Sequence, residues 1–230
     1  MSTVLLVRHG LTELTGRVLA GRSPGLHLDD RGRVQAAAVA GQIAVLPLAA
    51  VVSSPMERCV ETAEAIFAAQ RAAGSSPQWH LDERLTECDY GEWTGRAIPD
   101  LAKESLWRTV QTQPSAARFP GGETLAEVST RAVAAVRDWD ARLGSAAVWV
   151  VCSHGDPIKS VLADGLGLHL DLFQRIVVDP CSVSAIQYTT ARPLVVRSND
   201  FGGDLTVLVP PNAAGAPGTD PRKESPTEAD

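Results

Sequence analysis

The stretch Thr3-Val4-Leu5-Leu6-Val7, followed at once by Arg8-His9-Gly10, decides how this chain folds. A second apolar stretch, Ala147-Val148-Trp149-Val150-Val151-Cys152, ends in the same way at Ser153-His154-Gly155. Continuous apolar runs of this length, separated by helical stretches, are typical of buried parallel strands. Ligands in such sheets bind beyond the carboxyl ends of the strands. We therefore expect His9 and His154 to face one pocket.

Strand and helix signals alternate along the rest of the chain. Further strands are expected at residues 49–52, 79–81, 181–188 and 194–198, and helical segments at 31–46, 56–73, 98–110, 124–143 and 156–166. Pro47 is expected to close the first of these helices, and Pro55 to open the second. This order predicts an α/β fold: a three-layer sandwich in which a mostly parallel sheet is flanked by helices.

Length and composition favour one folded domain. The chain has 230 residues, of which 44% are hydrophobic and 21% charged, enough to bury a substantial core. We expect this domain to span residues 1–209, with a small helical cap inserted at about 92–120. From Pro210 onward the chain is rich in Pro, Gly, Ala and charge without periodicity, so residues 210–230 are expected to form a disordered tail.

Charge and cysteine usage narrow the class of protein. The net charge of −6 argues against nucleic acid as a partner, although a local arginine cluster could still hold phosphate. The N-terminus has no basic region followed by a long apolar run, so neither export nor a membrane is expected. The four cysteines are widely spaced and form no C-x-x-C pair, which indicates reduced thiols in a cytoplasmic protein. The oligomeric state stays open, with a homodimer as one alternative.

The residues that could meet at the carboxyl edge of the sheet are Arg8, His9, Arg58, Glu87 and His154. Guanidinium groups offer fork-shaped donors that match phosphate oxygens. A neutral imidazole beside fixed cations can attack phosphorus in line and form a phosphohistidine. Glu87 lies in a partly apolar loop, where its pKa could rise enough for it to protonate the leaving oxygen and later to activate water. A small phosphorylated substrate is the expected partner.

Each of these residues also has a more ordinary interpretation. Arg58 could form a solvated ion pair with Glu57 or Glu61, and Glu87 could be a loop carboxylate near Arg84. A metal-dependent hydrolase is a further alternative, with histidines and nearby carboxylates as the ligands. Two arginines beside such a site would repel a divalent cation, and no ligand pair has the usual metal spacing, so no metal and no cofactor are expected.

Order and spacing together are more specific than any one residue. Over residues 3–190 the chain resembles the phosphoglycerate-mutase-like branch of the histidine phosphatase superfamily. The matching blocks are LVRHGLT (6–12), SSPMERCVETA (53–63), LTECDYGEWTG (85–95), PGGET (120–124) and VCSHG (151–155). The fold that this resemblance implies is a mostly parallel sheet between helices, with the segment between Glu92 and Gly121 in a cap that shapes substrate choice.

The resemblance also implies a role for each site residue. His9 would be the phosphorylated nucleophile and Glu87 the acid and base. Arg8 and Arg58 would be the phosphate ligands, and His154 would be a catalytic residue that binds the transferring phosphoryl group in the transition state. Thr15 stands where the family often has an asparagine that touches phosphate, so it is a weaker candidate for the same contact. Arg22 and Gly155 are the candidate substrate-binding residues in the loops that follow the two histidine strands.

Departures from the family pattern separate its two main activities. In the mutases the acidic residue is typically followed by arginine and the second His-Gly by asparagine, whereas this chain has Cys88 and Asp156. We therefore expect a metal-independent phosphatase that hydrolyses a small or medium phosphate monoester. The cap also carries four basic residues that suggest an anionic substrate: Arg96, Lys103, Arg108 and Arg118. The alternatives are a cofactor-dependent phosphoglycerate-type mutase and a catalytically weak regulatory protein that binds a phosphorylated ligand.

Overall fold

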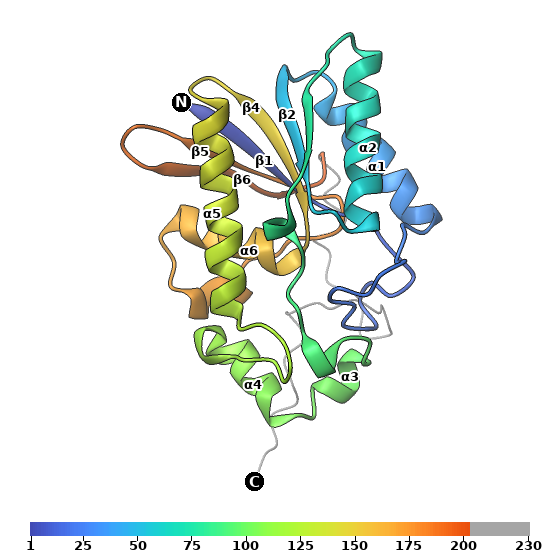
Figure 1. Ribbon diagram of the computed structural model, residues 1–230, viewed down its shortest axis with the longest axis vertical. Helices are drawn as coiled ribbons and strands as arrows, with labels where there is room; N and C mark the ends of the chain where they lie inside the picture. Colours follow the sequence, from blue (N-terminus) through green and yellow to red (C-terminus); the bar gives the residue numbers. More distant parts are fainter. Residues whose placement is uncertain (203–230) are drawn as a thin grey trace.

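A six-stranded sheet forms the centre of the molecule, with its strands in the order β3-β2-β4-β1-β5-β6 (Figure 1). A computed structural model describes residues 1–202, so the expected tail at 210–230 and the end of the domain at 209 lie outside the described residues. The strands are β1 (Ser2–Arg8), β2 (Leu48–Ser53), β3 (Gln78–Leu81), β4 (Val148–Ser153), β5 (Val183–Tyr188) and β6 (Pro193–Asp200).

Strand direction follows the predicted pattern, because four neighbouring strands are parallel. β2 pairs in parallel with both β3 and β4, and β1 pairs in parallel with β4, with Arg8 opposite Ser153. β5 runs antiparallel to β1, and β6 runs antiparallel to β5. The mostly parallel sheet is confirmed, and the ends of β1 and β4 lie side by side at its carboxyl edge.

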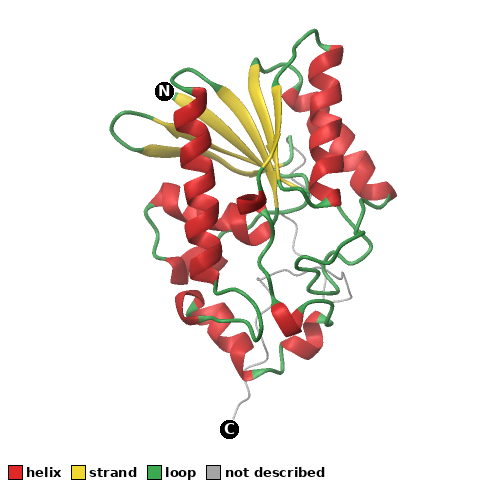
Figure 2. Ribbon diagram, viewed as in Figure 1, coloured by secondary structure: helices red, strands yellow, loops and turns green. Residues whose placement is uncertain are grey.

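Helices cover both faces of the sheet, which gives the three layers (Figure 2). One face carries α1 (Asp30–Ile43) and α2 (Glu57–Ala72), and the other carries α5 (Leu125–Leu143) and α6 (Gly155–Leu166). The short helices α3 (Ile98–Leu101) and α4 (Ser105–Thr112) lie past the carboxyl ends of the central strands (Figure 1). Short 3-10 turns occupy Glu83–Leu85, Gly91–Trp93, Pro114–Ala116 and Leu170–Arg175.

Alternation along each strand explains why its apolar run is continuous. In β1, Val4 and Leu6 pack into the cluster beneath α5 and α6, whereas Leu5 and Val7 pack into the cluster beneath α1 and α2. Both faces of a sheet between helices need apolar side chains. The polar residues that follow such a strand are therefore the first that can face a ligand.

Every expected strand and helical segment is present, with differences at a few ends. The segment predicted as helical at 98–110 is two helices, because Glu104 has extended backbone angles between them. β5 begins at Val183 because Cys181 has a φ of +57° and donates its N–H to the Arg8 carbonyl. α5 begins with a capping box formed by Thr124 and Glu127. Over residues 1–202, none of the helices combines the length and the apolar character needed to cross a bilayer.

Candidate active site

Two buried imidazoles form the centre of the site. His9 follows β1 and His154 follows β4, and the two strands are paired in register at their ends. The ring centroids lie 5.2 Å apart, with the ring planes at 63°. The two apolar runs thus bring both histidines to one point at the carboxyl edge, as the sequence predicts.

The hydrogen bonds of His9 fix which ring nitrogen carries the proton. Nδ1 lies 2.8 Å from the Gly10 carbonyl oxygen, which can only accept, so Nδ1 is the protonated nitrogen. Nε2 then presents its lone pair, and the Arg58 Nε–H donates to it over 3.3 Å. Burial, and after it the charges of Arg58 and Arg8, hold the pKa of His9 well below its usual range. His9 is therefore neutral, with Nε2 available as a nucleophile.

The two predicted phosphate ligands both reach this centre. Arg58 lies in the first turn of α2 with only 2% of its surface exposed, and its Nη2 donates to the Gly21 carbonyl over 2.8 Å. Arg8 donates from Nη1 to the Val178 carbonyl over 2.7 Å. The Nη1 of Arg58 and the Nε of Arg8 are buried and have no hydrogen-bond partner within residues 1–202. Buried donors of this kind are normally satisfied, so these two nitrogens are suited to an anion.

The ordinary interpretation of Arg58 as a solvated ion pair does not hold. Glu57 accepts a hydrogen bond from the Gly25 N–H over 2.9 Å. Glu61 accepts from the Leu28 N–H over 3.1 Å and contacts His27. Both carboxylates thus hold the loop that follows His9, and Arg58 turns inward.

His154 has partners that the sequence did not predict. Its Nε2 lies 2.9 Å from the Ser54 hydroxyl and 3.3 Å from the Cys59 thiol. Burial, followed by the Arg58 charge and the neighbouring His9, holds the pKa of His154 well below its usual range. Burial also raises the pKa of Cys59 to about 12, so this cysteine stays a thiol. The available sequence signal was the position of Ser54 directly after β2.

Glu87 lies at the same edge of the sheet. Its Oε1 accepts the Cys88 N–H over 3.0 Å, and a Cβ placed on Gly155 would lie 3.9 Å from its Oε2. Burial, and after it the Asp156 carboxylate, raise the pKa of Glu87 to about 7. At neutral pH this carboxyl group can thus both give and take a proton.

The neighbours of Glu87 bear on whether it is an ordinary loop carboxylate paired with Arg84 or a candidate acid and base. Arg84 is bound to Asp82 and Asp138, so it does not neutralise Glu87. The Tyr90 hydroxyl instead donates to Asp156 over 2.8 Å and keeps this second carboxylate beside the site. The pairing joins two segments 66 residues apart, which is why sequence reasoning missed it.

Thr15 and Arg22, the two weaker candidates of the sequence analysis, form hydrogen bonds within the protein. The Thr15 hydroxyl accepts the Thr12 N–H over 3.0 Å and lies 2.9 Å from the Thr12 hydroxyl, so it closes the turn after the first histidine. Arg22 donates from Nε to the Glu87 carbonyl over 2.9 Å and from Nη2 to Glu123 over 2.8 Å. Contacts of Thr15 with phosphate and of Arg22 with substrate stay predictions.

The charges of the predicted cap largely neutralise one another. Arg96 pairs with Glu104 over 2.7 Å, and Lys103 pairs with Asp100 over 3.0 Å. Arg118 lies 3.5 Å from the carboxylate of Glu127. Three of the four basic residues counted in the sequence are thus engaged, which weakens their value as a sign of an anionic substrate.

Within the described part of the chain, no three His, Cys, Asp or Glu side chains gather closely enough to hold a metal ion. All four cysteines, which lie within this part, are free and buried.

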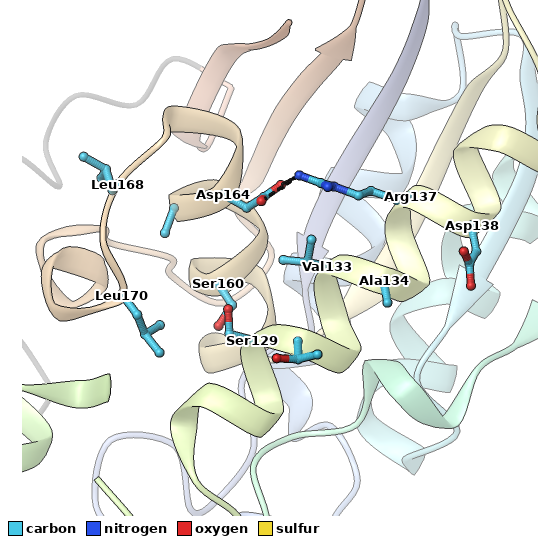
Figure 3. Close-up of a pocket in the computed structure, with 11 residues that line it drawn as sticks. Ser129, Val133, Ala134, Arg137, Asp138, Ser160, Asp164, Leu168 and Leu170 are labelled. Carbon is cyan, nitrogen blue, oxygen red and sulfur yellow. Dashed lines mark hydrogen bonds and ion pairs between the residues drawn. The ribbon is translucent and has the colours of Figure 1, made fainter. Parts of the chain in front are cut away.

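A separate surface groove of about 490 Å³ lies between α5 and α6 (Figure 3). Arg137 and Asp164 form an ion pair across it, 2.8 Å apart. Its other lining residues include Val133, Leu168 and Leu170. None of the predicted site residues lines this groove, so the candidate site is the histidine centre.

Fold and site together define an α/β protein in which two buried imidazoles lie close to arginine side chains at the carboxyl edge of the sheet. The chain belongs to the histidine phosphatase superfamily (branch 1), whose family model matches residues 4–201. The predicted family resemblance is thus confirmed, and it supports an enzyme of the phosphatase or mutase type.

Named relatives of both types match most of the chain. Phosphoserine phosphatase 1 of Hydrogenobacter thermophilus is 29% identical over 205 residues, covering 86% of this chain and 92% of the relative. The probable phosphoglycerate mutase GpmB of Enterobacter sp. (strain 638) is 31% identical over 191 residues, covering 82% and 86%. The solved structure of Bacillus stearothermophilus YhfR superposes with a TM-score of 0.78 at 24% identity, covering 87% of this chain and 98% of that one.

Proposed function

We propose that this protein is a metal-independent phosphatase that hydrolyses a small or medium phosphate monoester through a phosphohistidine on His9. One observation carries the proposal: the Nε2 of His9 accepts a hydrogen bond from Arg58, and the buried Nη1 of Arg58 and Nε of Arg8 have no hydrogen-bond partner among residues 1–202. The phosphoryl group of a monoester would satisfy these donors while its phosphorus faces Nε2.

In the first step, His9 Nε2 attacks phosphorus and the bond from phosphorus to the ester oxygen breaks. Arg8, Arg58 and His154 hold the equatorial oxygens, where charge is spread in the transition state. Glu87 gives its proton to the departing oxygen, so the product leaves as an alcohol. This step needs a protonated Glu87 and a neutral His9, and the directions of their pKa shifts favour both forms.

In the second step, water attacks the phosphohistidine and the bond between nitrogen and phosphorus breaks. The Glu87 carboxylate takes a proton from that water, and inorganic phosphate leaves. His9 recovers its neutral form and Glu87 its proton, so the cycle closes on side chains alone, without a metal or a cofactor.

Two features favour hydrolysis over the mutase reaction. A mutase must retain a doubly phosphorylated intermediate, which requires further cations around the pocket. Here the Asp156 carboxylate lies beside the site, held by Tyr90, and it would repel a second phosphoryl group. The paired charges of the cap supply little compensation for that repulsion.

We also propose that the protein is cytoplasmic, because its four cysteines are free thiols.

The test is intact-protein mass after rapid quenching without acid, with a panel of phosphorylated metabolites and inorganic phosphate followed in parallel. We expect an adduct of about one phosphoryl group that requires His9, is absent from His9→Ala, and decays as phosphate appears. A phosphoryl group that passes to an acceptor without free phosphate would establish the mutase instead. No adduct and no turnover with any compound would favour the regulatory protein.

A further inference from the structure

A guanidinium on α5 holds the loop that carries Glu87. Arg131 donates from Nη1 to the carbonyls of Arg84 and Thr86, over 2.8 and 2.6 Å, and from Nη2 to that of Glu87, over 3.0 Å. Its side chain is 17% exposed, so these bonds are largely shielded from water. One side chain thus binds three carbonyl oxygens within four consecutive residues of the loop.

The same guanidinium is itself held by a carboxylate. Glu123 accepts from both Nε and Nη2 of Arg131, each over 2.9 Å, which is the bidentate geometry of a strong pair. Glu123 also accepts the Asp89 N–H over 3.0 Å, on the far side of Glu87 in the sequence. Arg22 completes the network by binding both Glu123 and the Glu87 carbonyl.

We propose that Arg131, braced by Glu123, is a positioning residue that fixes the carboxyl group of Glu87 for proton transfer. The inference rests on the phosphatase mechanism proposed above. Glu87 has its carbonyl bound on one side by Arg131 and Arg22, and its own Oε1 is bound by the Cys88 N–H. Backbone and side chain are thereby held together, so movement of the carbonyl moves the acid.

Substitution by lysine tests this role without removing the charge. A lysine ammonium is a compact point charge and cannot span three carbonyls and a carboxylate as the planar guanidinium does. Arg131→Lys should therefore leave the loop folded but let Glu87 shift, and a displacement of about 1 Å can slow a reaction by about 100-fold. His9, Arg8 and Arg58 are untouched by this change.

Two substrates with different leaving groups distinguish a loss of proton donation by Glu87 from a general loss of activity. An alkyl phosphate needs a proton on its departing oxygen, whereas 2,4-dinitrophenyl phosphate releases the stable 2,4-dinitrophenolate anion readily without one. We expect Arg131→Lys to slow formation of the phosphoenzyme from an alkyl phosphate by about 10- to 100-fold and that from the dinitrophenyl ester by less than about threefold. The rates are measured by rapid quench, because steady-state turnover would mix both steps.

Arg137→Lys is the matched control, since this arginine lies on the same helix and pairs with Asp164 away from Glu87. It should leave both rates unchanged. Glu123→Gln removes the brace and should show the same selective loss, which keeps the test valid if Arg131→Lys does not fold. Equal slowing of both esters, or no slowing, overturns the positioning role. Absence of any phosphoenzyme in the unmodified protein instead overturns the phosphatase mechanism.

Discussion

Replacing Glu87 with glutamine removes a group that carries a proton but keeps the shape of the side chain. The amide oxygen can still accept the Cys88 N–H that Oε1 accepts in the native protein. The substitution should abolish the general acid catalysis proposed for Glu87. Its effect on stability tests the environment of the carboxyl group more directly, because the sign and size follow from the raised pKa.

The size of this effect comes from the pKa of about 7, against 4.5 for an ordinary glutamate. As the pH rises between these values, the unfolded chain releases this proton while the folded protein retains it, so the free energy of unfolding falls through this window. At about 1.36 kcal/mol per pKa unit, the full cost is about 3 kcal/mol above pH 7, with about 1 kcal/mol already present at pH 5. Glu87→Gln removes this cost.

The assay is urea unfolding of both proteins at pH 5 and at pH 8.5. We expect the stability of Glu87→Gln relative to the native protein to rise by about 2 to 3 kcal/mol between the two conditions. Glu83→Gln, which removes an exposed carboxylate from the same segment, controls for the loss of one negative charge. If the stability difference between Glu87→Gln and the native protein is the same at both pH values, Glu87 does not have a raised pKa and the proposed acid loses its physical basis.

Three further predictions, the first with its own control substitution, concern the site and the loop beside it. Gly91→Ala should destabilise the fold by more than about 2 kcal/mol in urea unfolding, because its φ is +52° and a Cβ would lie 2.1 Å from a backbone oxygen. Gly95 also has a positive φ but lies in open space, so Gly95→Ala should cost only about 1 to 2 kcal/mol in the same assay. Tyr90→Phe leaves the Asp156 carboxylate without its 2.8 Å donor and should lower the free energy of unfolding by about 1 to 3 kcal/mol at pH 8. Arg58→Ala should weaken vanadate binding, measured by calorimetry, by about 10- to 100-fold, and unchanged binding would remove this arginine from the anion site.

The fold was predictable because its signals are local. A continuous apolar run marks a strand covered on both faces, and β1 and β4 satisfy this with residues that alternate between two cores. The exact ends were less predictable, since they depend on contacts made elsewhere in the chain. Cys181 illustrates this, because its left-handed backbone and its hydrogen bond to Arg8 delay the start of β5.

Residues next to strand ends were also accessible from the sequence. His9 and His154 follow paired strands, so topology alone brings them together. Arg22 shows where this reasoning stops, because a guanidinium in a loop binds whichever acceptors the tertiary structure offers. The nearest acceptors were the Glu87 carbonyl and Glu123, 65 and 101 residues away in the sequence. No periodicity or spacing records such a partnership, and the same holds for Arg131.

The environment that favours a protonated Glu87 is made by the same packing that folds its loop. Leu85, Cys88 and Tyr90 are buried in the core cluster beneath α5, so the loop is held by apolar contacts on both sides of Glu87. Those contacts limit the access of water to the half-buried Glu87, and desolvation is the largest cause of its raised pKa. At neutral pH the free-energy cost of desolvating the Glu87 carboxyl group therefore offsets part of the stability that packing of this loop provides. A variant that opens the loop to water should lower the pKa of Glu87 and weaken the proposed proton donation, so the proposed catalysis and the local packing cannot be changed independently at this site.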